Sequence, residues 1–312
     1  MTISATSIKE KALQLGYSGC GIIPAATFEE YQKALDERIQ NFPESKERYK
    51  ALSAMANPPE GAKSIIVCIR GYSQYKIPES IKKHIGKYYM FHTEIPYSPG
   101  YQAKAEFTGY LQLAGLRIIK ANPPVRWAAV KAGLGKFGRN NFFYTEKHGS
   151  HVHIATWIVD AQFEYEKPVD TTIMPSCHEN CNKCVTACPT KALDGPFSMN
   201  YNKCVVPLIY KKEPPCEDIQ RQMGQWVYGC DACQDACPLN KGKFTEREEF
   251  PLLSQFAEHL LPEKILDMTE DDYANIIFPR LWYAGQDGLE TWKHNANRAI
   301  ANAAKNGGSC NE

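Results

Sequence analysis

The chain has 312 residues, of which 43% are hydrophobic and 23% are charged, a balance that is typical of globular proteins and excludes a disordered or collagen-like chain. The formal net charge is +1, but residues 1–170 carry 22 basic and 16 acidic side chains whereas residues 171–312 carry 14 basic and 19 acidic ones. An acidic half is a poor electrostatic partner for the phosphate backbone of a nucleic acid. No apolar run approaches the roughly 18 residues of a membrane span. The first residues also carry no export signal, so we expect a cytoplasmic protein with no membrane partner.

Helices and strands are expected to alternate through the first half of the chain, because apolar residues recur there at helical spacing between short apolar runs. The predicted elements are a helix at 8–15, a strand at 18–23, a helical stretch at 27–55 interrupted by Pro43, a strand at 64–69, a helix at 103–114 and a strand at 151–159. This alternation predicts an α/β (α+β) layer domain. We place it at residues 1–168.

The remainder of the chain divides into two further parts. A linker is expected at residues 166–176, which contain Pro168 and Pro175. A cysteine-rich segment follows, which we place at 169–245. Residues 246–312 form a predicted C-terminal helical segment, with its helical pattern strongest at 250–261 and 290–305.

Nine of the twelve cysteines lie between residues 177 and 237. In a chain without an export signal, a reducing compartment disfavours disulfides and favours metal ligation. The first run is C-x3-C-x2-C-x3-C-P and ends at Pro189, and the second is C-x2-C-x3-C-P and ends at Pro238. In ferredoxin-like runs of this kind the cysteine before proline ligates the other cluster. The spacing therefore predicts two 4Fe–4S clusters with crossed ligands.

The crossing assigns eight cysteines to eight ligand positions. One cluster is expected on Cys177, Cys181, Cys184 and Cys237, and the other on Cys188, Cys204, Cys230 and Cys233. A pair of four-thiolate zinc sites is the alternative, since zinc also uses C-x2-C pairs. The first gap is one residue longer than usual, and His178 lies beside Cys177. Cys20, Cys68, Cys216 and Cys310 are expected to have no ligand role.

Several short motifs outside and inside the cysteine runs can be compared with known families. A glycine loop, Gly133–Asn140, is preceded by Ala132 and followed by His148-Gly149-Ser150. The other stretches are Leu15–Ile22, Ala62–Val67, Ala187–Leu193, Asn202–Cys204 and Tyr228–Asn240. Together these motifs resemble those of the epoxyqueuosine reductases, and Arg139 in the glycine loop is closer to the related reductive dehalogenases.

The resemblance implies a nitroreductase-like domain that binds cobalamin base-off, next to a ferredoxin-like double 4Fe–4S module that reduces the cobalt. A corrinoid pocket is then expected between the two. Glycine suits a backbone that lies against a flat ligand, because it has no Cβ. The residues that match the corrinoid-approaching loop are Gly133, Gly135, Gly138, Asn140 and Asn141.

The match departs from the family at the proton donor. The epoxyqueuosine reductases carry an Asp-Ser-Ala-Pro stretch before the glycine loop, and its aspartate falls at Ile119 or Ala121 in this chain. The family's C-terminal helical repeats are also cut short here. Protonation requires an acid near the reacting group, and the candidates are Tyr101, Lys120, Tyr144, His151 and His153.

The first hypothesis is a cytoplasmic corrinoid-dependent iron–sulfur reductase that takes electrons from a ferredoxin- or flavodoxin-type donor and reduces a small electrophile, an epoxide or an organohalide. The missing aspartate and the acidic second half lead us to expect no tRNA substrate. A second hypothesis is an activator protein that reduces the cobalt of a partner corrinoid protein. A third places flavin in the pocket of a ferredoxin-type reductase.

Overall fold

The N-terminal half is built around one antiparallel sheet. In the computed structural model, residues 3–96, 98–167, 177–251, 253–281, 283 and 285–307 are described. The sheet has the order β1-β2-β6-β3, and each neighbouring pair is antiparallel. Its strands are β1 (Gly19–Pro24), β2 (Ser64–Gly71), β6 (Val152–Val159) and β3 (Ile118–Ile119).

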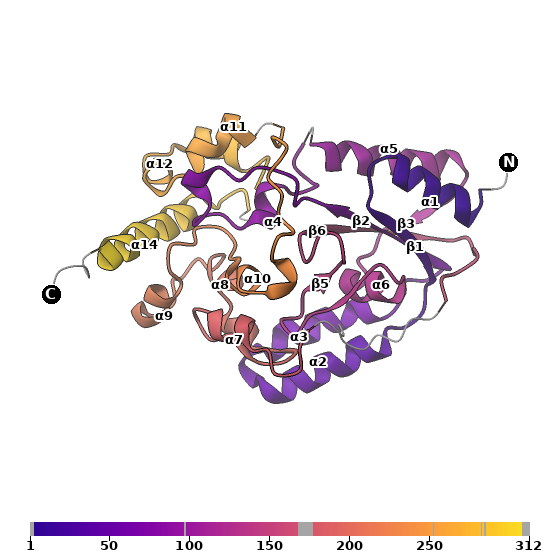
Figure 1. Cartoon of the computed structure of the whole chain (residues 1–312), viewed down its shortest axis with the longest axis horizontal. Helices are drawn as coiled ribbons and strands as arrows, with labels where there is room; N and C mark the ends of the chain where they lie inside the picture. Colours follow the sequence, from indigo (N-terminus) through magenta and orange to yellow (C-terminus); the bar gives the residue numbers. More distant parts are fainter. Residues whose placement is uncertain are drawn as a thin grey trace.

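Helices cover both faces of this sheet (Figure 1). Side chains alternate along β2, so Ile65 and Val67 enter one core while Ile66 and Cys68 enter the other. The first core lies under α2 (Glu29–Asn41), α3 (Lys46–Ser53) and α6 (Val125–Lys131), and the second lies under α1 (Ala5–Gln14) and α5 (Pro99–Leu113). The predicted α/β class is confirmed, and Pro43 does divide the long helical stretch, since it begins the short η1 (Pro43–Ser45).

The cysteine-rich segment consists of short helices and turns. Its own apolar core is small and consists of Cys184, Cys188, Ala192 and Leu193, because its other buried apolar side chains, between residues 205 and 228, join the core of the C-terminal helices. Its elements are α7 (Lys183–Ala187), β7 (Leu193–Gly195), β8 (Ser198–Met199), η4 (Tyr201–Lys203), α8 (Val205–Leu208), α9 (Glu217–Gln222), α10 (Ala232–Asp235) and η5 (Pro238–Asn240). Most of the expected linker, residues 168–176, lies outside the described residues.

The C-terminal helices share a core with the other two parts. That core combines residues 72–95, residues 205–228 and residues 250–299, and Tyr228 stacks on Trp292 with ring centroids 4.9 Å apart. Within the described residues, no helix combines the length and apolar character needed to cross a bilayer. The three-part division of the chain stays a prediction. The elements here are η3 (Glu79–Ile81), α4 (Lys87–Met90), α11 (Leu253–Phe256), η6 (Ala257–Leu260), α12 (Pro262–Leu266), α13 (Glu270–Asp272), η7 (Tyr273–Ile277) and α14 (Leu289–Gly307).

A buried polar junction joins the end of the second cysteine run to the start of β6. Ser150 donates through its backbone N–H to Asn240 Oδ1 at 2.8 Å and through its hydroxyl to Gln234 Oε1 at 2.8 Å. Asn240 Nδ2 in turn donates to the Gln234 carbonyl and to Ser150 Oγ. Buried polar groups that are all paired fix one arrangement. The junction therefore sets where Cys237 sits relative to the sheet.

The glycine loop packs tightly against the hairpin of β4 (Lys136–Phe137) and β5 (Phe143–Tyr144). A Cβ on Gly135 would overlap the carbonyl oxygen of Tyr144 and the Phe143 ring. We expect Gly135→Ala to lower the free energy of unfolding by about 1–3 kcal/mol, because backbone must move. Urea denaturation followed by circular dichroism measures this.

The matched control is Gly109→Ala, inside α5. A Cβ there meets nothing within 4 Å, so the change should raise stability by roughly 0.5–1 kcal/mol through helix propensity. Equal effects of the two substitutions would contradict the packing explanation.

Candidate functional site

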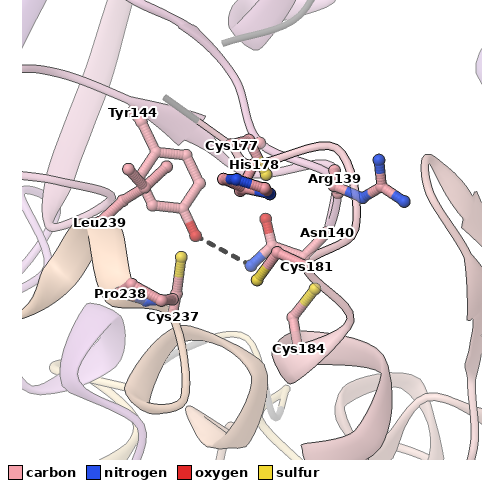
Figure 2. A pocket seen from close by; sticks show the side chains of 11 residues that line it. Arg139, Asn140, Tyr144, Cys177, His178, Cys181, Cys184, Cys237, Pro238 and Leu239 are labelled. Atoms are coloured by element: carbon pink, nitrogen blue, oxygen red, sulfur yellow. Dashed lines mark hydrogen bonds between the residues drawn. The ribbon is translucent and has the colours of Figure 1, made fainter. Parts of the chain in front are cut away.

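Four cysteines from both runs line a single cavity. Figure 2 shows the thiols of Cys177, Cys181, Cys184 and Cys237 turned toward the same space. Three of them come from the first run at and before α7, and Cys237 comes from the end of the second run, between α10 and η5. The structure thus brings together the set that the crossed spacing assigns to one cluster.

The other four predicted ligands form a second group. Cys188 lies in the small apolar cluster, with Cys204 and Cys233 packed against it. Burial and then the nearby Cys188 thiol raise the pKa of Cys204 to about 11, although a backbone hydrogen bond from Val206 opposes the shift. Burial raises the pKa of Cys230 as well, with Cys204 and Cys188 adding to it. Burial also raises the pKa of Cys233. Thiols crowded in this way ionise more readily beside positive iron, which suits the group to an iron–sulfur cluster.

The donor chemistry of both groups fits 4Fe–4S clusters. Each has four thiols, and each draws one thiol from the opposite run. The ligand roles of the individual cysteines stay predictions. His178 also lines the first cavity, so the structure places it within reach of the same space as Cys177. Cys20, Cys68 and Cys216 lie outside both groups, and Cys310 lies outside the described residues.

Tyr144 and Asn140 form the opposite wall of the first cavity. Asn140 Nδ2 donates to Tyr144 Oη at 2.9 Å, and the tyrosine hydroxyl lies beside the Cys237 sulfur (Figure 2). Burial, followed by the neighbouring Cys237, raises the pKa of Tyr144. The phenol is therefore protonated at physiological pH, and its role as a proton donor stays a prediction.

The glycine loop packs closely against residues of the same chain. Cβ atoms at Gly135 and Gly138 would collide with Phe143 and Tyr144, and Gly138 and Asn140 line the thiol cavity. The expectation that this loop approaches cobalamin stays a prediction.

The remaining two members of that predicted set serve local structure. Asn141 has a left-handed backbone, with φ of 65°, and its Oδ1 accepts from Arg38 Nη2 at 2.7 Å. Gly133, with φ of 71°, follows α6 at a turn that favours glycine.

A second cavity of about 300 Å³ adjoins the first. Cys237 and Pro238 line both cavities, so one predicted cluster ligand separates them. His151, from the start of β6, is 4% exposed and lines this cavity, and its Nδ1 has no hydrogen-bond partner. Burial, then Lys87, lowers the pKa of His151 to about 3, so the ring is neutral at physiological pH. The other lining residues are Lys87, Lys183, Asp235, Ala236, Asn240, Lys241 and Phe244.

A buried ion-pair network joins α4 to the loop that carries Cys230 and Cys233. The Lys87 backbone N–H donates to Asp231 Oδ2 at 2.8 Å. Its ammonium contacts Asp231 at 3.3 Å and Asp235 at 2.5 Å, while Lys87 and Asp231 are only 8% and 3% exposed. Lys87 could not be identified from the sequence, because it lies 144 residues from Asp231 and belongs to no motif.

The other proton-donor candidates lie apart from the cavities. Tyr101 is 42% exposed in the first turn of α5, and Lys120 is exposed. His153 is buried, and its ring packs against Tyr72 and Tyr88 with centroids 4.8 and 4.5 Å away. Ile119 ends the edge strand β3, and Ala121 is exposed beyond it. The position of the missing aspartate stays a prediction.

Comparison with known proteins identifies both the cluster segment and the whole chain. Residues 176–240 match the family described as a 4Fe-4S double cluster binding domain, which favours iron–sulfur clusters over zinc. Epoxyqueuosine reductase of Cyclobacterium marinum is 30% identical over 289 residues, 88% of this chain and 89% of that protein. That of Leadbetterella byssophila is 31% identical over 250 residues, 75% and 78% of the two chains.

Solved structures agree on the fold. A crystal structure of epoxyqueuosine reductase with an epoxyqueuosine-modified tRNA-Tyr stem loop has a TM-score of 0.74 at 23% identity, over 95% of this chain and 80% of that one. The Bacillus subtilis epoxyqueuosine reductase, described with an aspartate catalytic loop swung out of its active site, has a TM-score of 0.73 at 24% identity, over 94% and 80%.

The expectation that excludes tRNA as a partner is wrong, because relatives over most of the chain act on epoxyqueuosine and one matched structure holds a tRNA stem loop. The physical reason is that a charge summed over half a chain hides local clusters. Lys183 and Lys241 both line the second cavity, for example, although the half of the chain that contains them is acidic overall.

Removing one of the crossed cysteine ligands should prevent one of the two clusters from binding. We expect Cys237→Ser to lower the iron content of anaerobically purified protein from about eight to about four atoms per chain, whereas Cys216→Ser, a change at an exposed cysteine, leaves it unchanged. His178→Ala should also keep all the iron, and Cys177→Ala should not. Iron and sulfide analysis measures this, and four irons in His178→Ala would transfer the ligand role to the histidine.

Acid should destabilise the fold through its buried histidines. Burial lowers the pKa of His92 to about 4 and that of His153 well below its usual value. Around them lie Tyr72, Tyr88 and Tyr283, with Arg70, Glu94 and Lys104 as the charged neighbours. The unfolded chain binds more protons below about pH 6.5, so stability is complete above that pH and falls toward pH 4.

The His92 shift alone corresponds to about 3 kcal/mol. His153→Phe replaces a ring whose nitrogens are both buried without a hydrogen-bond partner. The free energy of unfolding of this variant should therefore fall less steeply as the pH is lowered. Urea unfolding at pH 7, 6 and 5 measures the slope. An unchanged slope in the variant would contradict this assignment.

Proposed function

Because the chain belongs to the epoxyqueuosine reductase family, we propose that this oxidoreductase uses two 4Fe–4S clusters to reduce the epoxide of epoxyqueuosine in a tRNA stem loop. One observation carries the proposal. Cysteines from both runs converge on one cavity, and Cys237 of that set also lines a second cavity large enough for a small molecule. Cavities of roughly 300–1,000 Å³ hold small ligands.

The electron count matches this reaction. Opening an epoxide by reduction consumes two electrons and two protons, whichever C–O bond breaks. When bound, the two clusters supply single electrons, and an external donor of the ferredoxin or flavodoxin type replaces them. The chain's part is to hold each cluster through four thiolates, to fix Cys237 through the Ser150–Asn240 junction, and to place the substrate beside it.

Proton supply falls to the lysines of the second cavity. His151 is neutral at physiological pH, and burial raises the pKa of Tyr144. The ammonium groups of Lys183 and Lys241 line the cavity from exposed positions, where each Nζ can regain a proton from water. They can therefore donate toward a developing alkoxide without a dedicated carboxylic acid.

Packing against Phe143 and Tyr144 accounts for glycine at positions 135 and 138 without a flat ligand. The proposed reaction therefore draws on the two clusters and not on a corrinoid.

The test is turnover of a synthetic epoxyqueuosine-modified tRNA stem loop by anaerobically reconstituted protein with a photoreduced flavodoxin, followed by mass spectrometry of the nucleosides. We expect reduction without added cobalamin and at least a hundredfold loss in Cys237→Ser. Reduction that appears only with added cobalamin would overturn the direct route, and failure under both conditions would overturn the proposed substrate. Reduction of an added corrinoid protein instead would favour the activator hypothesis.

A further inference from the structure

Two cysteines that belong to neither thiol group face each other in the sheet. β1 and β2 are antiparallel, and Cys20 lies directly opposite Cys68 in their register. Cys68 is buried in the core under α1 and α5 (Figure 1), and Cys20 packs against the same core. Both side chains therefore point to one face of the sheet, and neither lines either cavity of the site.

The hydrogen-bond pattern of the two strands brings this pair close together. The backbone N–H of Ala25 donates to the carbonyl oxygen of Lys63 at 3.0 Å, and these two residues continue the register of β1 and β2. Hydrogen-bonded and non-hydrogen-bonded pairs alternate along an antiparallel ladder. Cys20 and Cys68 lie an odd number of positions away, so they form a non-hydrogen-bonded pair. Such pairs have Cα atoms about 4.5 Å apart, within the range of about 4.4–6.8 Å that a disulfide spans.

The two thiols differ in their access to solvent. Cys20 is partly exposed, whereas Cys68 is 0% exposed. Burial and then a side-chain hydrogen bond with Cys20 raise the pKa of Cys68. That hydrogen bond places the two sulfurs in contact, and a buried thiol that stays protonated is protected from direct attack by an oxidant. An oxidant in solution therefore reaches Cys20 first.

We propose that Cys20 and Cys68 form a reversible disulfide when the protein meets a peroxide. The Cys20 thiolate attacks one peroxide oxygen, so an S–O bond forms, the O–O bond breaks and a sulfenic acid results. The Cys68 sulfur then attacks the Cys20 sulfur. The S–S bond forms, the S–O bond breaks, and the hydroxyl leaves with the Cys68 proton as water. In total the two thiols lose two electrons and two protons, and hydrogen peroxide becomes two molecules of water.

The proposed bond is independent of the reaction on epoxyqueuosine, because it uses no cluster ligand. It ties the edge strand β1 to β2 and closes a loop that contains α2 and α3. Disulfides in reducing compartments are usually transient and redox-sensing rather than structural, and a dithiol reductant of the thioredoxin type reverses them. The pair is therefore suited to sensing an oxidant.

Peptide mapping of the full-length holoprotein tests the proposal. Trypsin cuts after Lys and Arg, so it releases Cys20 in peptide 12–33 and Cys68 in peptide 64–70, each with a single cysteine and neither with a predicted cluster ligand. A small molar excess of hydrogen peroxide, followed by alkylation of the remaining thiols, should raise the amount of the cross-linked peptide pair at least about tenfold. Its mass should lie two hydrogens below the sum of the two peptides. Dithiothreitol added to the folded protein should remove the cross-link.

Variants separate the roles of the two thiols. In Cys68→Ala the cross-link should be absent, and dimedone, which traps sulfenic acids, should label Cys20. In Cys20→Ser, Cys68 should remain a thiol. The matched control combines Cys68→Ala with Ile69→Cys, which keeps a cysteine in the same peptide but on the opposite face of the sheet, where Ile69 packs. This control should form no cross-link, and each variant should keep the iron content of the wild type.

Three outcomes would contradict the proposal. A wild type that forms no cross-link, or forms one that dithiothreitol cannot remove from the folded protein, would overturn it. An equal yield of cross-link in the Ile69→Cys control would also overturn it, because the strand register would then play no part. Equal oxidation of Cys68 in Cys20→Ser would overturn the order of the two steps.

Discussion

The crossing of the cysteine runs is the constraint on which the rest of the site depends. A cluster that takes Cys237 from the second run and three thiols from the first can form only when the two runs lie against each other. Because the cysteine-rich segment has a very small apolar core, its shape must come from the clusters and from contacts with the other parts. The Ser150–Gln234–Asn240 junction provides one such contact, and it ends three residues beyond Cys237.

The Lys87 network supports the other cluster in a similar way. Burying Lys87 together with Asp231 costs desolvation free energy, and Asp235, whose side chain is about half exposed, adds a contact from the solvent side. The network is therefore better evidence for a fixed position than for stability. Its backbone hydrogen bond to Asp231 holds α4 against the loop between Cys230 and Cys233. The α4 helix also contributes to the core shared with the C-terminal helices. It therefore connects that core to the segment that carries Cys230 and Cys233.

The sequence predicted the parts of this protein that depend on local pattern. The strand at 64–69 appears as β2 because its apolar side chains alternate between two cores, and the C-x2-C and Cys-Pro spacings locate the thiols because a short loop determines which sulfurs can meet. Lys87 could not be predicted, since its partners lie 144 and 148 residues away. Glycines at 135 and 138 correctly indicated a close approach, but the sequence could not show that the approaching group is Tyr144 of the same chain.

That close approach gives the glycine loop a role at the cluster. With no Cβ on Gly138, the Tyr144 ring lies directly against the loop, and Asn140 can donate to its oxygen at 2.9 Å. The Tyr144 oxygen thus accepts a hydrogen bond from Asn140. The hydrogen of the tyrosine hydroxyl is then free to face the Cys237 sulfur beside it (Figure 2). Hydrogen bonds to ligand sulfurs stabilise the more negative, reduced form of a cluster and so raise its potential. The loop and the tyrosine therefore act on the same sulfur that separates the two cavities. In the proposed reaction, the hydrogen bond from Asn140 to the phenol thus tunes the potential of the cluster that is expected on Cys237.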